Sequence, residues 1–198
     1  SGPSEHQSDF IWIIDPLDGT TNFLHNFPQY CVSIALQHKG EITQAVIYEP
    51  NRNDLYTATK GRGAFLNDKR IRVSKCDKLK ESLIGTGFPF RDFKHLDTYL
   101  GMFKSMLQKS SGIRRPGSAA LDLAYVANGS LDAFWEIGLS SWDIAAGALL
   151  VQEAGGIISN LNGKEGWLES GNVLTSTPKI YDAMVETLAP HLTEDIKN

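Results

Sequence analysis

The stretch IIDPLDGTTNF, residues 13–23, places two acids in a stiff turn directly after a run of apolar and aromatic residues. That run, FIWII at 10–14, predicts a buried β-strand with Asp15 at its carboxyl end. Pro16 has no backbone N–H and a fixed φ, so it stiffens the turn that leads to Asp18. Two carboxylates this close repel each other unless a cation lies between them. The stretch therefore suggests a metal site.

The same turn is rich in the oxygen atoms that Mg²⁺ prefers as ligands, in octahedral geometry at about 2.0–2.1 Å. Asp15 and Asp18 offer carboxylates, and Leu17 offers its backbone carbonyl. Gly19–Thr21 adds backbone N–H groups and hydroxyls that suit an anion held beside the metal. A D-x-x-D-G pattern is also common in turns and helix caps, where aspartate bonds backbone amides. The residues of the turn alone leave both uses open.

A third acid, Asp143, precedes a helix rich in small residues, IAAGALLVQEAGG. An aspartate in this position commonly serves as a helix N-cap. The small residues Ala145–Gly147 would also let this end of the helix approach another backbone closely. In that case Asp143 could reach Asp15 and Asp18 and complete a cluster of three carboxylates.

Composition and charge indicate an ordinary globular protein, which we expect to form a single domain over residues 1–198. Hydrophobic residues make up 41% of the chain and charged residues 21%, and the net charge of −4 disfavours nucleic acid or an anionic membrane as the main partner. Cys31 and Cys76 lack C-x-x-C spacing, which indicates a reducing compartment without a disulfide framework. With no apolar run of membrane-spanning length and no visible signal peptide, we expect a cytoplasmic protein.

Periodicity and turn residues predict strands in the first half of the chain and alternating strands and helices in the second. The expected strands cover 10–14, 30–38, 41–49, 54–59, 131–137 and 157–159, and the expected helices cover 95–110, 119–128, 143–154 and 178–188. Lys39-Gly40 and Asn67-Asp68 mark turns, and Ser118 is expected to cap the helix that follows it. This order indicates a layered α/β or α+β architecture.

One of these helices, 95–110, has a clear apolar stripe. The residues on this stripe, which we expect to face the core, are Leu96, Tyr99, Leu100, Phe103, Met106 and Leu107.

Two longer stretches, WIIDPLDGTTNFLH at 12–25 and WDIAAGALLVQEAGG at 142–156, resemble the signature motifs of the inositol monophosphatase family. GSAALDLAYVANGSLDAFWEIG at 117–138 fits the segment between them, and GTGFPFR at 85–91 resembles the bacterial members. The resemblance covers essentially the whole chain. It implies a magnesium-dependent, lithium-sensitive sugar phosphatase with a layered αβαβα sandwich, usually a homodimer.

The resemblance also implies roles for the matching residues. Asp15 would bridge two Mg²⁺ ions, Leu17 would contribute its backbone carbonyl, and Asp18 and Asp143 would complete the second metal site. The intact family site holds two or three Mg²⁺ ions and is inhibited by Li⁺. The implied catalytic residues are Asp15, Asp18 and Thr20, whose hydroxyl helps to orient the attacking water.

Substrate contacts are implied in the same way. Gly19 and Thr20 would hold phosphate through their backbone amides. The other implied contacts are Asp18, Gly117, Ser118, Ala119, Glu136 and Asp143. The expected substrate is inositol monophosphate or a related sugar or polyol phosphate. Paired metals about 3.5–4 Å apart support an in-line displacement by water without a covalent enzyme intermediate.

One family motif does not occur in the printed sequence. Family members have two helices and a Gly-Glu-Glu stretch ahead of the acidic turn, and that Glu binds the first metal. This chain opens SGPSEHQSDF, and Glu5 has neighbours that give it no fixed position, so we interpret it as an exposed loop acid. We therefore expect a domain that lacks its N-terminal helices, with Asp15, Asp18 and Asp143 still forming a complete second site.

Several alternatives remain open. Haloacid dehalogenase phosphatases carry D-x-D-G-T, with the acids two positions apart, whereas Pro16-Leu17 here makes the spacing three. This difference puts one acid out of register and disfavours that class. Within the resembled family, fructose-1,6-bisphosphate, NADP or phosphoadenosine phosphate are alternative substrates. A binding role belongs to a different class, because some bacterial relatives are partners of the RNA polymerase antitermination machinery.

Other polar and aromatic residues near these motifs receive a structural interpretation. Arg114-Arg115 is typical of a solvated pair, and His25 is interpreted as a loop residue, so we leave them out of the site. We expect Trp135 and Trp142 to pack beside Glu136 and Asp143 and to position them.

Overall fold

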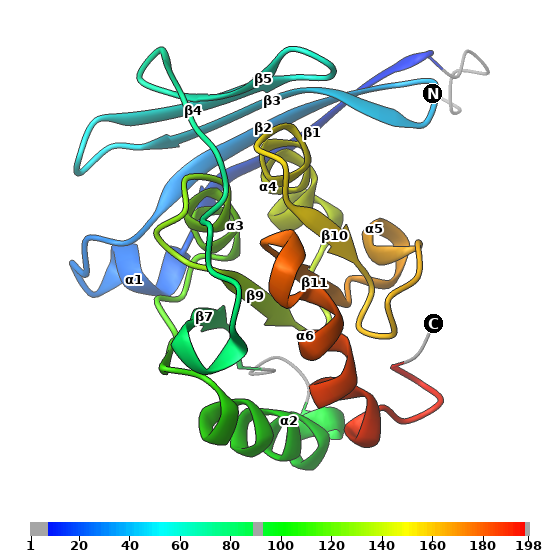
Figure 1. Cartoon of the computed structure of the whole chain (residues 1–198). Coiled ribbons are helices and arrows are strands. Elements are labelled where there is room, and N and C mark those ends of the chain that lie inside the picture. The colour runs from blue at the N-terminus through cyan, green and yellow to red at the C-terminus, as the bar shows by residue number, and fades with distance from the viewer. Residues whose placement is uncertain (1–7, 89–92, 197–198) are drawn as a thin grey trace, which may run out of the picture.

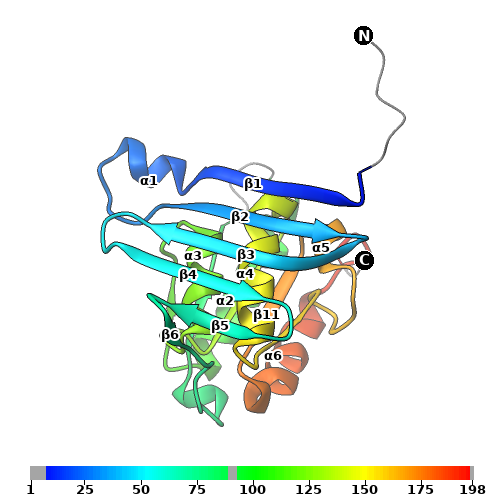
Figure 2. The same cartoon turned by 90° about the horizontal axis from the view of Figure 1, so that it is seen from above.

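The computed structural model describes residues 8–88 and 93–196, which form four alternating layers (Figures 1 and 2). A six-stranded sheet is followed by α3 (Ala119–Ala127) and α4 (Ser141–Glu153), then by a five-stranded sheet, and finally by α2 (Leu96–Lys109) and α6 (Tyr181–Leu188). This mixed α+β arrangement confirms the predicted layered fold. Glu5 and the end of the GTGFPFR segment lie outside the described residues.

The six-stranded sheet is antiparallel throughout, in the order β1-β2-β3-β4-β5-β6. Its strands are β1 (Phe10–Asp18), β2 (Cys31–His38), β3 (Glu41–Glu49), β4 (Asp54–Thr59), β5 (Gly63–Leu66) and β6 (Lys69–Arg70). Both predicted turns are present. Lys39 and Gly40 have φ of 51° and 84°, and Asn67 and Asp68 have φ of 46° and 64°. Consecutive left-handed residues of this kind match the twist of the strands that they connect.

The prediction that residues 10–14 are buried is wrong for most of the segment. The side chains of Phe10, Trp12 and Ile14, on one face of β1, are 54%, 62% and 50% exposed. β1 is the edge strand of its sheet and pairs only with β2. In the part of the chain that the structure describes, the helices lie against the opposite face of this sheet (Figure 1). Apolar composition predicted a strand correctly but could not show which face is covered.

The central helices α3 and α4 share a core with the inner face of the first sheet. Ser118 caps α3 as predicted, because its hydroxyl accepts a hydrogen bond from the backbone N–H of Leu121 at 3.4 Å. The predicted close approach of α4 is also present. A Cβ atom built on Gly147 would lie 2.4 Å from the Cβ of Leu123 in α3, so a side chain at this position would separate the two helices.

The five-stranded sheet has the order β10-β11-β9-β7-β8, with β7 parallel to β8 and β9 and the other pairs antiparallel. Its strands are β7 (Leu83–Thr86), β8 (Gly112–Arg114), β9 (Ala133–Glu136), β10 (Ile157–Ser159) and β11 (Val173–Ser176). Sequence patterning predicted β9 and β10 but missed β7, β8 and β11, although all five strands have only three or four residues. Strands this short carry little periodic signal, so patterning finds some and misses others.

The outer helices α2 and α6 cover the other face of this sheet and enclose a second core. In α2 the side chains of Tyr99, Met102 and Met106 are fully buried, whereas Leu100 and Leu107 are 49% and 52% exposed. The prediction that Leu100 and Leu107 face the core was therefore wrong. The buried face of α2 is centred on Met102, and the two leucines lie beside it. The remaining short elements are α1 (Thr20–Leu24), α5 (Trp167–Ser170), η1 (Leu79–Glu81), η2 (Phe93–His95), η3 (Pro178–Ile180) and η4 (Ala189–His191).

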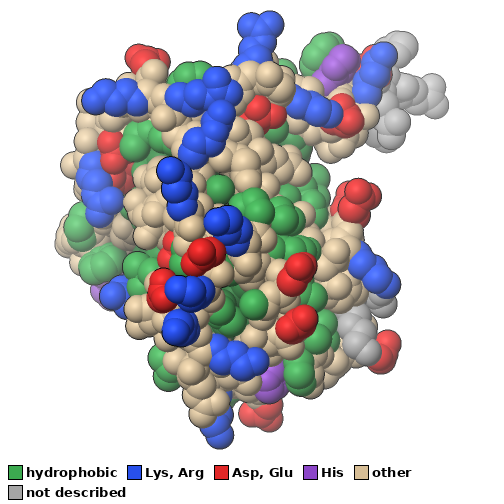
Figure 3. Space-filling model, in the orientation of Figure 1, with side chains coloured by type: hydrophobic (Ala, Val, Ile, Leu, Met, Phe, Trp, Pro, Cys, Tyr) green, Lys and Arg blue, Asp and Glu red, His purple; other side chains and the backbone are tan. Residues whose placement is uncertain are grey.

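Two general properties of the described residues complete this picture. None of their helices combines the length and the apolar character needed to cross a bilayer. Figure 3 shows acidic and basic side chains interspersed over one face of the molecule, with hydrophobic side chains between them.

Candidate active site and metal centre

The acidic turn lies at the end of β1, where the strand pairing is irregular. Asp15 pairs with Ser33 and Asp18 pairs with Cys31, so the register shifts between the two acids. Strand irregularities of this kind redirect side chains and are frequent beside functional sites. Asp15 accepts a hydrogen bond from the backbone N–H of Leu17 at 3.0 Å through its Oδ1 atom. The turn thus holds Asp15 in place and still leaves its second oxygen available.

Asp18 is held by the amino-terminal end of α3. Its Oδ2 atom accepts hydrogen bonds from the Ser118 hydroxyl at 2.6 Å and from the backbone N–H of Ala120 at 2.9 Å. The positive end of the helix dipole also favours an anion here. Both bonds go to Oδ2, so the described residues leave Oδ1 available for a cation. Residues 100 or more positions apart in the chain therefore build this corner of the site.

The environment of Asp18 raises its pKa to about 6. Burial is the main cause, and it outweighs the two hydrogen bonds, which act in the opposite direction. The negative charges of Asp143 and Asp15 raise the pKa further. A bound cation would relieve this crowding of charge, since it favours the ionised carboxylate.

Asp143 reaches the same place from the first turn of α4. The helix starts two residues earlier than predicted, at Ser141, so Asp143 is not its N-cap. Instead its Oδ2 atom accepts a hydrogen bond from the backbone N–H of Ser140, the residue at the N-cap, at 2.8 Å. This is the carboxylate half of a capping box, so Asp143 stabilises the helix end and also faces the other two acids.

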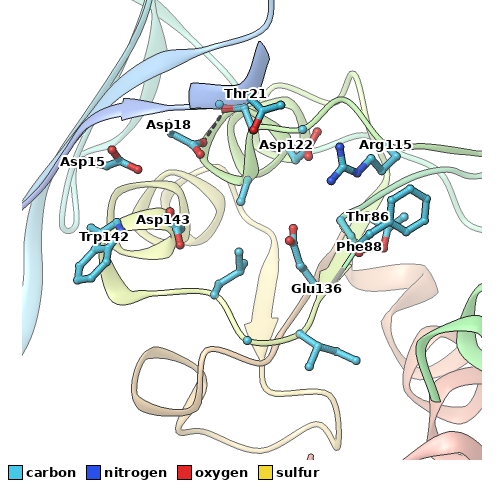
Figure 4. A pocket seen from close by; sticks show the side chains of 18 of the residues that line it. Asp15, Asp18, Thr21, Thr86, Phe88, Arg115, Asp122, Glu136, Trp142 and Asp143 are labelled. Atoms are coloured by element: carbon cyan, nitrogen blue, oxygen red, sulfur yellow. Dashed lines mark hydrogen bonds between the residues drawn. The ribbon is translucent and has the colours of Figure 1, made fainter. Parts of the chain in front are cut away.

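Asp15, Asp18 and Asp143 form one cluster, in which a carboxylate oxygen from each residue lies within 4.8 Å of the others. Figure 4 shows the three side chains on one side of a common pocket. The donor set consists of hard oxygens, which suits Mg²⁺ or a similar divalent cation and not a metal that prefers sulfur or nitrogen. The convergence of the three acids shows that these residues fit such an ion.

The pocket around this cluster has a volume of about 810 Å³. Its lining includes every residue that sequence analysis assigned to the site: Asp15, Leu17, Asp18, Gly19, Thr20, Gly117, Ser118, Ala119, Glu136 and Asp143. His25 and Arg114 do not line it, as expected. Segments from β1, α3, β9 and α4 meet here, and the side chain of Asn22 connects two of the surrounding loops. Its Nδ2 atom donates to the carbonyl oxygens of Gln29 at 2.8 Å and Pro116 at 2.9 Å.

Within the turn, Thr20 and Leu17 are connected directly. The Thr20 hydroxyl donates a hydrogen bond to the Leu17 carbonyl oxygen at 2.8 Å. A carbonyl oxygen has two lone pairs, so this bond still leaves Leu17 able to bind a cation.

The opposite side of the pocket contains Glu136, Asp122 and Arg115, as Figure 4 shows. The Glu136 carboxylate packs against the backbone at Gly87, where an added Cβ atom would lie 2.1 Å from its Oε1 atom. Only glycine at position 87 leaves room for this carboxylate. The Arg115 guanidinium lies over the Phe88 ring at 4.9 Å from its centroid. This cation–π contact holds the Arg115 side chain against the wall of the pocket.

Sequence reasoning missed several residues on this side of the pocket, among them Thr86, Phe88, Arg115 and Asp122. Arg115 was interpreted as solvated, and it is indeed exposed, but its side chain also lines the pocket. Trp142 is 47% exposed and lines the pocket, whereas Trp135 is fully buried. A signal for Asp122 was present, because it lies four residues after Ser118 and so on the same face of the predicted helix.

Known proteins share both the sequence and the fold. Residues 1–194 match the sequence model of the inositol monophosphatase family. "Nus factor SuhB" of Pseudomonas aeruginosa is 53% identical over 192 residues, which cover 96% of this chain and 71% of the relative. "Inositol-1-monophosphatase" of Mesorhizobium japonicum is 49% identical over 181 residues, which cover 91% of this chain and 68% of the relative. The solved structure of an inositol monophosphatase from Anabaena sp. PCC 7120 superimposes with a TM-score of 0.90 at 38% identity, and the match covers 94% of this chain and 74% of the other.

Proposed function

The chain belongs to the inositol monophosphatase family, and from this premise we propose that it is a magnesium-dependent phosphatase of inositol monophosphate and related polyol phosphates. The observation that carries the proposal is the convergence of three carboxylates at one side of the pocket. The family is metal-dependent, and these oxygens are the ligands that Mg²⁺ prefers. When bound, such an ion would polarise the phosphate ester and make a water molecule more nucleophilic.

The residues around the cluster have complementary tasks in this proposal. Asp15, Asp18 and Asp143 bind the cation together with the Leu17 carbonyl. Thr20 directs its proton toward Leu17, so the Thr20 oxygen is available to accept a hydrogen bond from the attacking water and orient it.

The backbone and the far wall would hold the ester itself. The backbone N–H groups of Gly19 and Thr20 hold the phosphate. Glu136, with the segment Gly117–Ala119, contacts the hydroxyl-bearing part of the substrate.

The substrate class follows from the family and from the relative named inositol-1-monophosphatase, and the volume of the pocket is compatible with it. A pocket of about 810 Å³ accommodates a single sugar-sized ring with its phosphate. Fructose-1,6-bisphosphate, NADP and phosphoadenosine phosphate remain the alternative substrates to be tested in the same panel.

A panel of phosphate esters, assayed with and without Mg²⁺, tests the proposal. We expect release of phosphate from inositol monophosphate that requires Mg²⁺ and that Li⁺ inhibits. The panel should include the three alternative substrates, and a variant of an exposed acid far from the pocket, Asp182→Asn, should behave as the wild type. Failure of the wild type to hydrolyse any of the esters in the presence of Mg²⁺ would contradict the proposal.

A second candidate function is favoured by the names of several relatives. Proteins 46% to 53% identical to this chain are named Nus factor SuhB. A role as a binding partner in transcription antitermination is therefore a candidate as well, alone or beside the phosphatase activity. A pull-down with purified RNA polymerase and Nus factors, using wild type and Asp15→Asn side by side, separates the two functions. If Asp15→Asn still binds RNA polymerase or the Nus factors but no longer hydrolyses the ester, the two functions depend on different parts of the protein.

A further inference from the structure

Asp122 is the most unusual polar group in the pocket. Asp122 lies in α3, is only 1% exposed, and lines the pocket on the side of Glu136. Its Oδ1 atom is buried and has no hydrogen-bond partner among the described residues. Buried polar groups nearly always have a partner, which is either a protein group or a bound molecule. Because Asp122 lines the pocket, a molecule bound there can supply the partner that the described residues do not.

The surroundings of Asp122 favour its uncharged form. Burial raises its pKa well above the ordinary value, and the negative charges of Glu136 and Asp18 add to this effect. Arg115 acts in the opposite direction but is the smallest of these influences. An uncharged carboxyl group offers an O–H donor and a C=O acceptor side by side. A substrate hydroxyl, which also donates and accepts, can form hydrogen bonds with both.

We propose that Asp122 is a specificity-determining residue whose carboxyl group binds a hydroxyl of the substrate beside Glu136, so that the pocket selects polyol phosphates over esters without hydroxyls. This inference rests on the proposed phosphatase function and extends it to a residue outside the metal-binding end. Beside Glu136, the uncharged carboxyl group of Asp122 can donate a hydrogen bond as well as accept one. A ligand without hydroxyls would leave the Asp122 carboxyl buried and unsatisfied.

The experiment compares two esters that differ only in their hydroxyls: inositol monophosphate and cyclohexyl phosphate. Hydrolysis of p-nitrophenyl phosphate with Mg²⁺ serves as the reporter, and each ester is added as a competitor. The ratio of the two inhibition constants then measures how strongly the pocket prefers an ester with hydroxyl groups to one without them. The proteins compared are the wild type, Asp122→Leu, Asp122→Asn and the exposed control Asp182→Asn.

We expect Asp122→Leu to reduce the discrimination by about 10- to 100-fold, since sites that hydrogen-bond a substrate group strongly reject analogues lacking it. Asp122→Asn keeps one donor and one acceptor in nearly the same place and should retain most of the discrimination. Circular dichroism of both variants establishes that they fold. Asp182→Asn should leave the ratio unchanged.

Two results would contradict the inference alone. Hydrolysis of the reporter by the wild type, with an unchanged ratio in a folded Asp122→Leu variant, would show that Asp122 does not read hydroxyls. Loss of discrimination in Asp122→Asn as complete as in Asp122→Leu would show that a donor and acceptor pair is not what the site uses. A wild type that hydrolyses neither the reporter nor inositol monophosphate would instead contradict the proposed function, and with it the inference.

Discussion

The two sides of the pocket each contain a buried aspartate whose pKa is raised by burial, but only Asp18 has hydrogen bonds that oppose this rise. Asp18 accepts hydrogen bonds from Ser118 and from the backbone of Ala120, whereas the Oδ1 atom of Asp122 has no partner among the described residues. Hydrogen bonds to a carboxylate favour its charged form, and burial without them favours the neutral acid. The same residue type is thus prepared for a cation on one side of the pocket and for a hydroxyl on the other.

A single helix makes this difference possible. Ser118 caps α3 and bonds Asp18, and Asp122 follows one turn later on the same helix, where its backbone N–H donates to the Ser118 carbonyl oxygen at 3.0 Å. The free N–H groups of a helix end are available only in the first turn. Asp18 therefore meets the positive end of α3, while Asp122 projects from a turn whose backbone groups are already paired. The two aspartates therefore differ because Asp18 meets the first turn of α3, whereas Asp122 belongs to the next turn.

The largest effect on activity is expected from a substitution on the side of the pocket that would bind the cation. Asp15→Asn keeps the size of the side chain and an oxygen for the N–H of Leu17, but it removes one negative charge from the cluster. Loss of several kcal/mol of transition-state stabilisation corresponds to about a 10³-fold decrease in kcat/KM. Steady-state assays with Mg²⁺ measure this decrease, and thermal unfolding should show a folded variant. Activity within about tenfold of the wild type, with Asp182→Asn as the control, would argue strongly against the metal assignment.

The next effect concerns pH and the charge of Asp18 in the ion-free protein. Its pKa is about 6 in the folded state and 3.8 in the reference state, so between pH 4 and 6 the unfolded chain releases a proton that the folded protein keeps. The contribution of Asp18 to stability is therefore present at acid pH and is lost as pH rises to 6. A shift of this size corresponds to about 3 kcal/mol.

Urea denaturation with EDTA, at pH 4.5 and pH 7, measures this dependence in wild type and Asp18→Asn. The free energy of unfolding of the wild type should decrease with pH more than that of the variant, and Mg²⁺ should restore stability above pH 6. Identical pH dependence in the two proteins would show that Asp18 does not titrate as described.

A smaller effect on activity is expected from a substitution beside Glu136, on the other side of the pocket. Gly87→Ala places a Cβ atom on the Glu136 carboxylate and must displace it. Because the displaced Glu136 carboxylate would no longer contact the substrate in the same place, we expect roughly a tenfold lower kcat/KM for inositol monophosphate, which corresponds to about 1.4 kcal/mol. The matched control is Gly112→Ala in β8, where the nearest atoms to the added Cβ are 3.4 and 3.6 Å away. Equal behaviour of the two variants would mean that the position of the Glu136 carboxylate is unimportant.

The smallest effect concerns the connection between the two sides. Ser118→Ala removes a hydrogen bond to Asp18 and the cap of α3, which should decrease stability by about 1 kcal/mol. It should also raise the pKa of Asp18 further, because the lost bond lowers it. Thermal unfolding and the pH dependence of Mg²⁺ binding measure these changes, with the exposed Ser130→Ala as the control. No change in either property would show that Ser118 is only a neighbour of the site.

Sequence reasoning predicted one side of the pocket far better than the other. Asp15, Asp18 and Asp143 lie in motifs whose composition already indicates a cation site, and all three meet as predicted. Asp122 lies in a predicted helix and Arg115 lies just before it. The only signal for Asp122 was its spacing from Ser118, and no signal indicated that Arg115 lines a pocket. The exposure of Phe10 and Trp12 was missed for a related reason, since apolar composition cannot distinguish the covered face of a sheet from the open one. Burial and tertiary contact, not local pattern, decide these cases.

Binding of Mn²⁺, followed by electron paramagnetic resonance, most directly tests the claim that three distant acids form one cation site. The wild type should bind Mn²⁺, and Mg²⁺ should displace it. Asp143→Asn keeps an oxygen for the N–H of Ser140 and so preserves the start of α4, but we expect at least about tenfold weaker binding because a charged ligand is lost. Equal Mn²⁺ affinity in the wild type and in a folded Asp143→Asn variant would contradict the account.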